Sequence, residues 1–247
     1  MGRTPTSPGP LSSGPACSLC FTDAVWALLE PLRAEEREAF LALAHRRTFA
    51  RNEVLCHEGD PADSLHLVER GHLAVSGTLA SGAAATFTVL SPGDYFGELA
   101  LLRADRRRTA TVTALEECQT LAVAASAFDR LCEHNPAIER VVSTLLADRI
   151  DRLSRRLLET MYESLDRRVH RRLLDLAEAY GGSAGAGNSA VVIPLSQAQL
   201  ADLVGATRPP VNQVLQRLAD SDVVRLSRSR IEVLDPAELR RRSAEAI

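Results

Sequence analysis

The chain has 247 residues, of which 45% are hydrophobic, 25% charged and 4% aromatic. This composition is typical of a globular protein with one large or two ordinary domains, and it excludes a disordered, collagen-like or disulfide-stapled chain. The formal net charge is −3 at pH 7, so any surface that binds nucleic acid must be a local concentration of positive charge. All 29 basic residues are arginine, which offers a planar fork to phosphate and carboxylate groups.

The first part of the chain carries no signal for export or membrane insertion. Residues 1–15 are rich in Pro, Gly and Ser and contain one arginine and no apolar segment. They predict a disordered tail, which we extend to residues 1–20, rather than a signal peptide. No apolar run approaches the roughly 20 residues that span a bilayer. We therefore expect a cytoplasmic protein with no membrane partner.

A series of short strands follows two short helices. Residues 25–45 carry apolar residues at helical spacing, interrupted by Pro31, and predict the two helices. Between residues 48 and 123, short apolar stretches alternate with turn signals, at 58–60, 70–71, 81–82 and 91–94. Many short strands at regular spacing predict an antiparallel β-roll or jelly roll, which we assign, with the helices, to residues 21–135.

A long helix is expected over residues 136–164, where the apolar period becomes helical. Its apolar stripe consists of Leu146, Ile150, Leu153, Leu157 and Met161. A long helix with a narrow apolar stripe needs a partner, because packing supplies most helix stability. We expect the stripe to be the seam of a homodimer. The alternative is that it packs on the β-roll of its own chain.

Residues 165–247 carry the signals of a winged helix-turn-helix in the expected order. A helix over 166–180 ends at a pair of glycines. The next signals are a helix cap, a tight turn, a second cap with prolines in the first turn, and two strands, at Ser196, Gly205, Thr207 to Pro210, and 223–234. Together they predict a first helix, a recognition helix and a wing.

The recognition helix and wing have the charge and side chains that double-stranded DNA requires. Between residues 205 and 231, five arginines and two aspartates leave a local charge of 5 − 2 = +3. Arginine can bind guanine, and Asn or Gln can bind adenine, from a helix in the major groove, while other residues hold phosphates. The expected DNA-binding residues are Thr207, Arg208, Asn212, Gln213, Arg217, Arg228 and Arg230. A winged domain used for protein contact is the alternative.

The most specific segment is GDYFGELALL at residues 93–102, followed by RRRTAT at 106–111. It resembles the phosphate-binding cassette of the CRP/FNR superfamily of bacterial regulators, specifically the cyclic-AMP receptor branch, and the helix-turn-helix resembles the same family. The likeness covers roughly residues 25–235. It implies an α+β protein with a cyclic-nucleotide-binding β-roll, a long dimerisation helix and a winged helix-turn-helix. It also implies an allosteric transcription regulator, with RNA polymerase as a protein partner.

The resemblance implies a cyclic nucleotide effector, with cyclic AMP expected and no metal. The single negative charge of a cyclic phosphodiester suits the fork of Arg108 and the hydroxyl of Thr109, and nearby backbone N–H groups can complete the cradle. Glu98 would accept a hydrogen bond from the ribose 2′-hydroxyl. The implied pocket is Gly97, Glu98, Leu99, Ala100, Arg108 and Thr109. The alternative is a Glu98–Arg108 pair that braces an empty roll, in a regulator active without a nucleotide.

The chain departs from the family pattern in both halves. In the cyclic-AMP receptors two adjacent hydroxyl residues of the long helix contact the adenine, and the matching positions here are Leu153 and Ser154. Ser154 is the polar contact that remains, so selectivity between adenine and guanine stays open. On the recognition helix Arg208 matches a base-reading arginine, but Pro209 and Gln213 replace a family Glu and Arg. We therefore expect a pseudo-palindromic operator with a different sequence.

The cysteines provide a competing interpretation. The FNR branch holds an oxygen-sensitive iron–sulfur cluster, which needs about four thiolates, with amino-terminal cysteines and one from the roll. Here Cys17 and Cys20 form a C-x-x-C pair without the third nearby cysteine. Iron–sulfur or thiol-based redox sensing is thus the alternative function. An enzyme is not expected, because the six histidines are scattered, with no paired carboxylates, nucleophile or phosphate-binding loop beside them.

Overall fold

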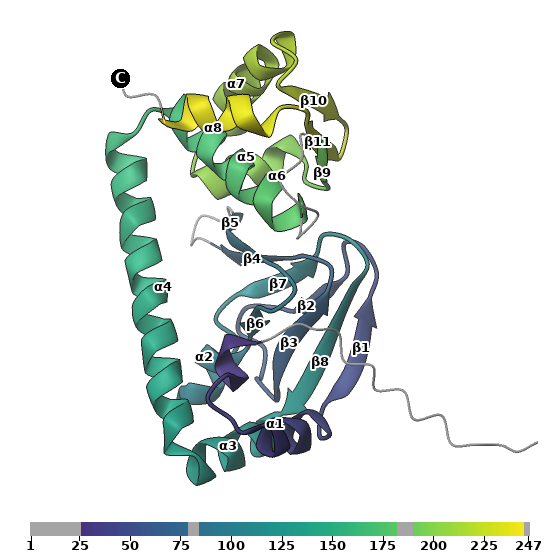
Figure 1. Ribbon diagram of the computed structural model, residues 1–247, viewed down its shortest axis with the longest axis vertical. Helices are drawn as coiled ribbons and strands as arrows, with labels where there is room; N and C mark the ends of the chain where they lie inside the picture. The colour runs from purple at the N-terminus through teal and green to yellow at the C-terminus, as the bar shows by residue number, and fades with distance from the viewer. Residues whose placement is uncertain (1–25, 79–83, 182–189, 245–247) are drawn as a thin grey trace, which may run out of the picture.

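The computed structural model describes residues 26–78, 84–181 and 190–244. These form a β-roll with short helices at one end, a long helix along its side, and a smaller domain at the other end (Figure 1). The expected amino-terminal tail, with Cys17 and Cys20, lies outside the described residues. Within the described ranges, no helix has both the length and the apolar character to cross a bilayer.

Two four-stranded antiparallel sheets form the roll, with the strand orders β1-β8-β3-β6 and β2-β7-β4-β5. The strands are β1 (His45–Phe49), β2 (Val54–Cys56), β3 (Ser64–Arg70), β4 (Leu73–Thr78), β5 (Ala84–Leu90), β6 (Tyr95–Phe96), β7 (Thr111–Ala114) and β8 (Cys118–Ala124). Phe49 and Val68 of one sheet pack against Leu73 and Val112 of the other. The β-roll predicted from the short strands is confirmed.

The helices at the end of the roll close its core. They are η1 (Ala27–Leu29), α1 (Ala34–Leu41) and α3 (Ala125–His134), and a further short helix, α2 (Glu98–Leu102), follows β6. Pro31 separates the first two, as its lack of an N–H predicts. Leu28, Leu29 and Phe128 are fully buried, and they share one apolar cluster with Leu65 and Leu67 of the roll.

The long helix α4 (Pro136–Tyr162) has two different halves. Its first turns bury Ile138 and Val142 against the end of the roll, and Leu146 packs against the same cluster. Beyond this point the apolar side chains are exposed, including Ile150 at 64% and Leu157 at 62%. The alternative in which the whole stripe packs on its own roll therefore holds only for Leu146.

The carboxyl-terminal domain is a winged helix-turn-helix, as predicted. Its elements are α5 (Leu165–Gly181), β9 (Val191–Ile193), α6 (Gln197–Val204), α7 (Arg208–Asp220), β10 (Val224–Ser227), β11 (Arg230–Val233) and α8 (Pro236–Ala244). Ser196 caps α6 in a capping box with Gln199, and Gly205 takes the left-handed conformation (φ 66°) that the tight turn requires. Strand β9 and helix α8 extend the predicted wing and core.

Thr207 occupies the N-cap position of α7, but its side chain makes no capping hydrogen bond. An N-cap hydroxyl accepts from the N–H of the second or third helical residue. Here these residues are Pro209 and Pro210, which have no N–H. The prediction that Thr207 caps the recognition helix is correct for position and wrong for the hydrogen bond, and its exposed hydroxyl is left for another partner.

Candidate ligand cavity and nucleic-acid interface

Arg108 is a buried arginine with one nitrogen unpaired. Backbone hydrogen bonds to the 59–60 turn hold it in place, with Arg108 N donating to Asp60 O at 2.8 Å. Its side chain is 5% exposed. Nη2 donates to Ser64 Oγ at 3.1 Å and lies 3.5 Å from Asp63 Oδ1. Nη1 is buried and has no hydrogen-bond partner among the described residues. Because a buried unsatisfied charged donor is costly, this nitrogen is a candidate partner for an anion.

Gly97 makes room for this guanidinium. Its φ of 99° lies in the left-handed region that favours glycine. A Cβ at this position would lie 2.4 Å from Arg108 Nη1 and 2.8 Å from Ser64 O. The backbone of Gly97 and the guanidinium of Arg108 can therefore be in contact only because no side chain separates them.

Glu98 is buried at the start of α2, and its partner is on the long helix. Its carboxylate Oε1 lies 3.3 Å from Nη1 of Arg149 on α4. Burial raises the pKa of Glu98, and the positive charge of Arg149 opposes this shift. Because Glu98 pairs with Arg149, the Glu98–Arg108 pair that would brace an empty roll is not formed.

One cavity collects all six roll residues that the sequence assigned to the ligand: Gly97, Glu98, Leu99, Ala100, Arg108 and Thr109. A neighbouring cavity of about 360 Å³ lies between β5, β6 and α4. The two cavities share Glu98 and Arg149 in their walls. Leu153 lines the larger one, whereas Ser154 is exposed and does not line either cavity in the single chain.

A chain of polar side chains behind Arg108 orients it. Ser64 Oγ accepts from Arg108 Nη2, lies 2.8 Å from Asp63 Oδ1 as its donor, and lies 3.1 Å from His66 Nε2. His66 Nδ1 lies 3.1 Å from Thr120 Oγ1, and the ring stacks on Phe96 at 4.7 Å between centroids. Burial, followed by the charge of Arg108, lowers the pKa of His66 to about 4.

The cavity also contains residues that the sequence analysis did not assign to the ligand, among them Arg149 and Cys56. Arg149 contacts Glu98 from α4, and Cys56 lines the wall near Arg108. Helical spacing offered a signal for Arg149, because it follows Val142 by seven residues and therefore shares its roll-facing side. The sequence offered no comparable signal for Cys56.

The residues predicted to bind DNA lie on α7 and the wing, in different environments. Thr207, Arg208, Gln213, Arg228 and Arg230 are exposed. Asn212 is half-buried, and its Oδ1 is buried without a partner among the described residues. Arg217 forms an ion pair with Asp166 of α5. Gln216, which the sequence analysis omitted, is exposed one helical turn after Gln213.

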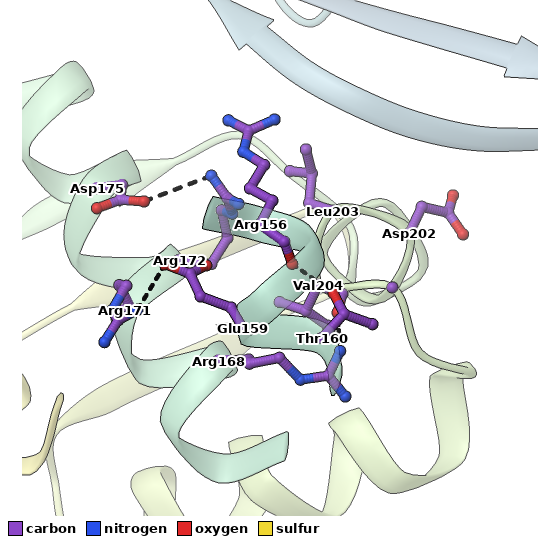
Figure 2. A pocket seen from close by; sticks show the side chains of 11 residues that line it. Arg156, Glu159, Thr160, Arg168, Arg171, Arg172, Asp175, Asp202, Leu203 and Val204 are labelled. Carbon is purple, nitrogen blue, oxygen red and sulfur yellow. Dashed lines mark hydrogen bonds and ion pairs between the residues drawn. The ribbon is translucent and has the colours of Figure 1, made fainter. Parts of the chain in front are cut away.

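A polar pocket joins the end of the long helix to the helix-turn-helix (Figure 2). Arg171 of α5 donates to Glu159 of α4 at 2.5 Å and to Glu163 at 3.0 Å. Arg168, also on α5, donates through Nη1 to the carbonyl oxygen of Val204 at the end of α6, at 2.7 Å. Helix α5 therefore connects the end of α4 to α6, the first helix of the helix-turn-helix.

The alternative interpretation was a metal cluster, and the described part of the chain contains no set of ligands for one. Across residues 26–78, 84–181 and 190–244, no three His, Cys, Asp or Glu side chains are grouped so that they could hold a metal ion. Cys118 is buried and donates weakly to His72 O at 3.2 Å. Cys17 and Cys20 lie outside the described residues.

The fold and the site define a DNA-binding regulator with a nucleotide-sensor type of β-roll, and comparisons with known proteins agree. Residues 46–135 match the cyclic nucleotide-binding domain, and residues 167–242 match the Crp-like helix-turn-helix domain. The chain is 30% identical over 212 residues to a cyclic AMP receptor protein of Thermus thermophilus, covering 86% of this chain and 94% of that protein. The chain belongs to the CRP/FNR family of transcription regulators, and it is not an enzyme.

Further relatives are consistent with this assignment. A CRP-like cAMP-activated global transcriptional regulator of Mycobacterium tuberculosis is 29% identical over 195 residues, which cover 79% of this chain and 86% of the relative. A solved CRP-family regulator of Thermus thermophilus has 27% identity and a TM-score of 0.65, covering 81% of this chain and 97% of that one. The c-di-GMP responsive regulator of Xanthomonas campestris shares the fold, with a TM-score of 0.67 at 22% identity and coverage of 82% and 99%.

Proposed function

We propose that this regulator is a homodimer whose binding to DNA is controlled by a cyclic nucleotide held between Arg108 and Glu98. The observation that carries the proposal is the buried, unpaired Nη1 of Arg108 in a cavity that also contains a buried carboxylate. A cyclic phosphate would pair with the guanidinium, and the ribose 2′-hydroxyl would donate to Glu98. A ligand with one anion and one hydroxyl donor matches both groups.

Cyclic AMP is the effector that we propose. The relatives that match over most of their length are described as cyclic-AMP-activated regulators or receptors. The larger cavity beside Glu98 has room for a base against α4, with Leu153 in its wall. Ser154 is exposed on the same helix, and we propose that it reaches the base when a second copy brings the two long helices together.

The ligand would act through the Glu98–Arg149 contact. Arg149 belongs to α4, so any ligand that recruits the Glu98 carboxylate competes with the long helix for it. The ligand can shift the protein only through unequal affinity for two arrangements of α4. In the DNA-binding arrangement, two recognition helices would enter major grooves about 34 Å apart on a pseudo-palindromic operator. Such a regulator would act in the cytoplasm, with RNA polymerase as its partner.

Calorimetric titration with cyclic AMP, cyclic GMP and cyclic di-GMP tests the ligand. We expect Arg108→Leu to weaken cyclic AMP binding by about 100-fold, because two charge-assisted hydrogen bonds contribute roughly 3 kcal/mol together. The matched control is Arg107→Leu, because Arg107 is exposed and adjacent and should leave the affinity unchanged. Unchanged affinity in Arg108→Leu would disprove the site.

The proposed sequence-specific DNA binding requires Arg208 to discriminate between operator and random DNA. We expect Arg208→Ala to lower the preference for the operator by about 1–3 kcal/mol, because one base contact is lost. Competition between the operator and a random duplex at fixed salt measures this preference. Arg103→Ala, which removes an exposed arginine from the roll, is the control, and cyclic AMP binding should persist in both variants.

A further inference from the structure

Cys56 is a thiol in the wall of the ligand cavity. It ends β2, and its register shifts between Val54 and Cys56 where β2 pairs with β7. The side chain is half-buried and lines the same cavity as Glu98 and Arg108. No role in nucleotide binding requires a thiol at this position.

The sulfur contacts backbone groups on and next to β7, including that of Val112. Its Sγ lies 3.9 Å from Ala110 O, a distance at which a thiol donates at most weakly. Burial raises the pKa of Cys56, the charge of Arg108 opposes this shift, and Asp60 and Asp63 add to it. The reactivity of the thiol therefore depends on the same guanidinium that we assign to the phosphate.

A second feature of the cavity, the unpaired guanidinium nitrogen of Arg108, is suited to an anion in the same cavity as this thiol. Arg108 is 6% exposed, and its Nη1 has no hydrogen-bond partner among the described residues. Any anion in the cavity gains by pairing with this nitrogen. A deprotonated sulfur acid on Cys56 is such an anion, and it would be held in place covalently.

We propose that Cys56 is an oxidation site inside the ligand cavity and that its oxidation by a hydroperoxide excludes the anionic effector. This inference rests on the proposed function for the identity of the effector, but not for the reaction itself. The thiolate sulfur attacks one peroxide oxygen, the O–O bond breaks, and the sulfur loses two electrons to become a sulfenic acid. With hydrogen peroxide the second oxygen leaves as hydroxide and becomes water when it takes the sulfenic proton, and with an organic hydroperoxide it leaves as an alkoxide and becomes an alcohol.

The resulting sulfenate and a cyclic phosphate compete for one guanidinium. Both are monoanions, and the sulfenate adds an oxygen to the wall of the cavity. A bound nucleotide, in turn, would neutralise Arg108, so that nothing from this guanidinium would oppose the rise in the thiol pKa caused by burial. The nucleotide would therefore slow the oxidation. The cavity would thus report a nucleotide only under reducing conditions, because thiols reverse a sulfenic acid.

The first experiment measures the reaction without any nucleotide. Reduced full-length protein is treated with hydrogen peroxide, sulfenic acid is trapped with dimedone, and peptides are quantified by mass spectrometry. We expect Cys56 to be labelled faster than Cys118 and Cys132 in the same chain. In Arg108→Leu the rate at Cys56 should fall about tenfold, because removal of the cation raises the pKa of the thiol and so lowers the fraction of reactive thiolate. Equal rates in the two proteins, or no label on Cys56, would overturn the proposal.

The second experiment measures the consequence for the effector. Peroxide should weaken the binding of cyclic AMP to wild-type protein about tenfold, and dithiothreitol should restore it. The affinity of Cys56→Ser for cyclic AMP should be the same before and after peroxide, whereas Cys132→Ser should lose affinity on oxidation as wild type does. Loss of affinity in oxidised Cys56→Ser would refute the assignment. If untreated protein binds no cyclic nucleotide, the proposed function fails, and the dimedone rates still decide the role of Cys56.

Discussion

At the scale of single residues, the cavity depends on an arginine that is oriented from behind by Ser64 and Asp63, with His66 next to Ser64. Ser64 contacts Arg108 on one side and His66 on the other. A protonated His66 would place a second positive charge beside the guanidinium in a buried site. The burial that lowers the pKa of His66 to about 4 therefore also preserves the geometry of Arg108 at neutral pH.

Because of His66, the free energy of unfolding should depend on pH in the acid range. Its folded pKa of about 4 lies below its ordinary value of 6.5, so the unfolded chain binds the proton first as pH falls. The free energy of unfolding should therefore decrease between pH 6.5 and 4, by at most about 3 kcal/mol from this residue. Urea titrations of wild type and His66→Gln across this range measure the difference. Parallel pH profiles for the two proteins would contradict it.

At the scale of elements, α4 has two packing surfaces along its length. Ile138 and Val142 are buried against the roll of the same chain, whereas Ile150, Leu157 and Met161 remain exposed. Exposed apolar residues at steps of three and four form one stripe on a helix, and water is an unfavourable environment for so many of them together. The second surface is therefore suited to a second copy of the same helix.

Leu157→Glu tests this seam. Leu157 is exposed in the single chain, so the substitution should leave the protomer folded while it places like charges opposite each other in a dimer. We expect a weakening of the dimer by at least about 2 kcal/mol, measured by sedimentation at several concentrations. Arg155→Glu, two residues away and on the opposite side of the helix, should leave the dimer intact. A dimeric Leu157→Glu would place the seam elsewhere.

At the scale of the whole molecule, the carboxyl-terminal winged helix-turn-helix domain is packed on the roll (Figure 1). His72 stacks on Tyr180 of α5 at 3.7 Å between ring centroids, and its Nδ1 lies 2.6 Å from Glu116 Oε1. Arg51 of the roll donates to Ser229 O in the wing at 3.1 Å. The backbone between the wing residues Arg228 and Arg230 is therefore held by the roll in this arrangement.

Loosening this contact should release the winged helix-turn-helix domain from the roll. We expect Tyr180→Ala to raise DNA affinity in the absence of nucleotide by about fivefold, because an aromatic stack contributes roughly 1 kcal/mol. Tyr180→Phe is the matched control, since the ring remains and the lost hydroxyl is buried without a partner among the described residues. Fluorescence anisotropy with operator DNA measures the change. Equal affinity in the two variants would show that the contact does not restrain the domain.

The sequence by itself determined the order of the β-roll, the long helix and the winged helix-turn-helix, and the residues of the cassette, but not α2, α3, β9 or α8. Period and turn residues are local properties, so the strands, Pro31, the Ser196 cap and the Gly205 turn were predictable before any packing was known. The segment at 93–111 likewise indicated Glu98 and Arg108 as candidate ligand-binding residues, through their spacing and the family resemblance.

Only the tertiary structure decided which side chains meet across the chain. The pairing of Glu98 with Arg149, 51 residues apart, and the placement of Cys56 beside Arg108 depend on how α4 and β2 pack on the cavity. The His72–Tyr180 stack has the same origin. Such contacts join residues with no periodic relation in sequence, so they follow from the packing of preformed elements and not from local propensity.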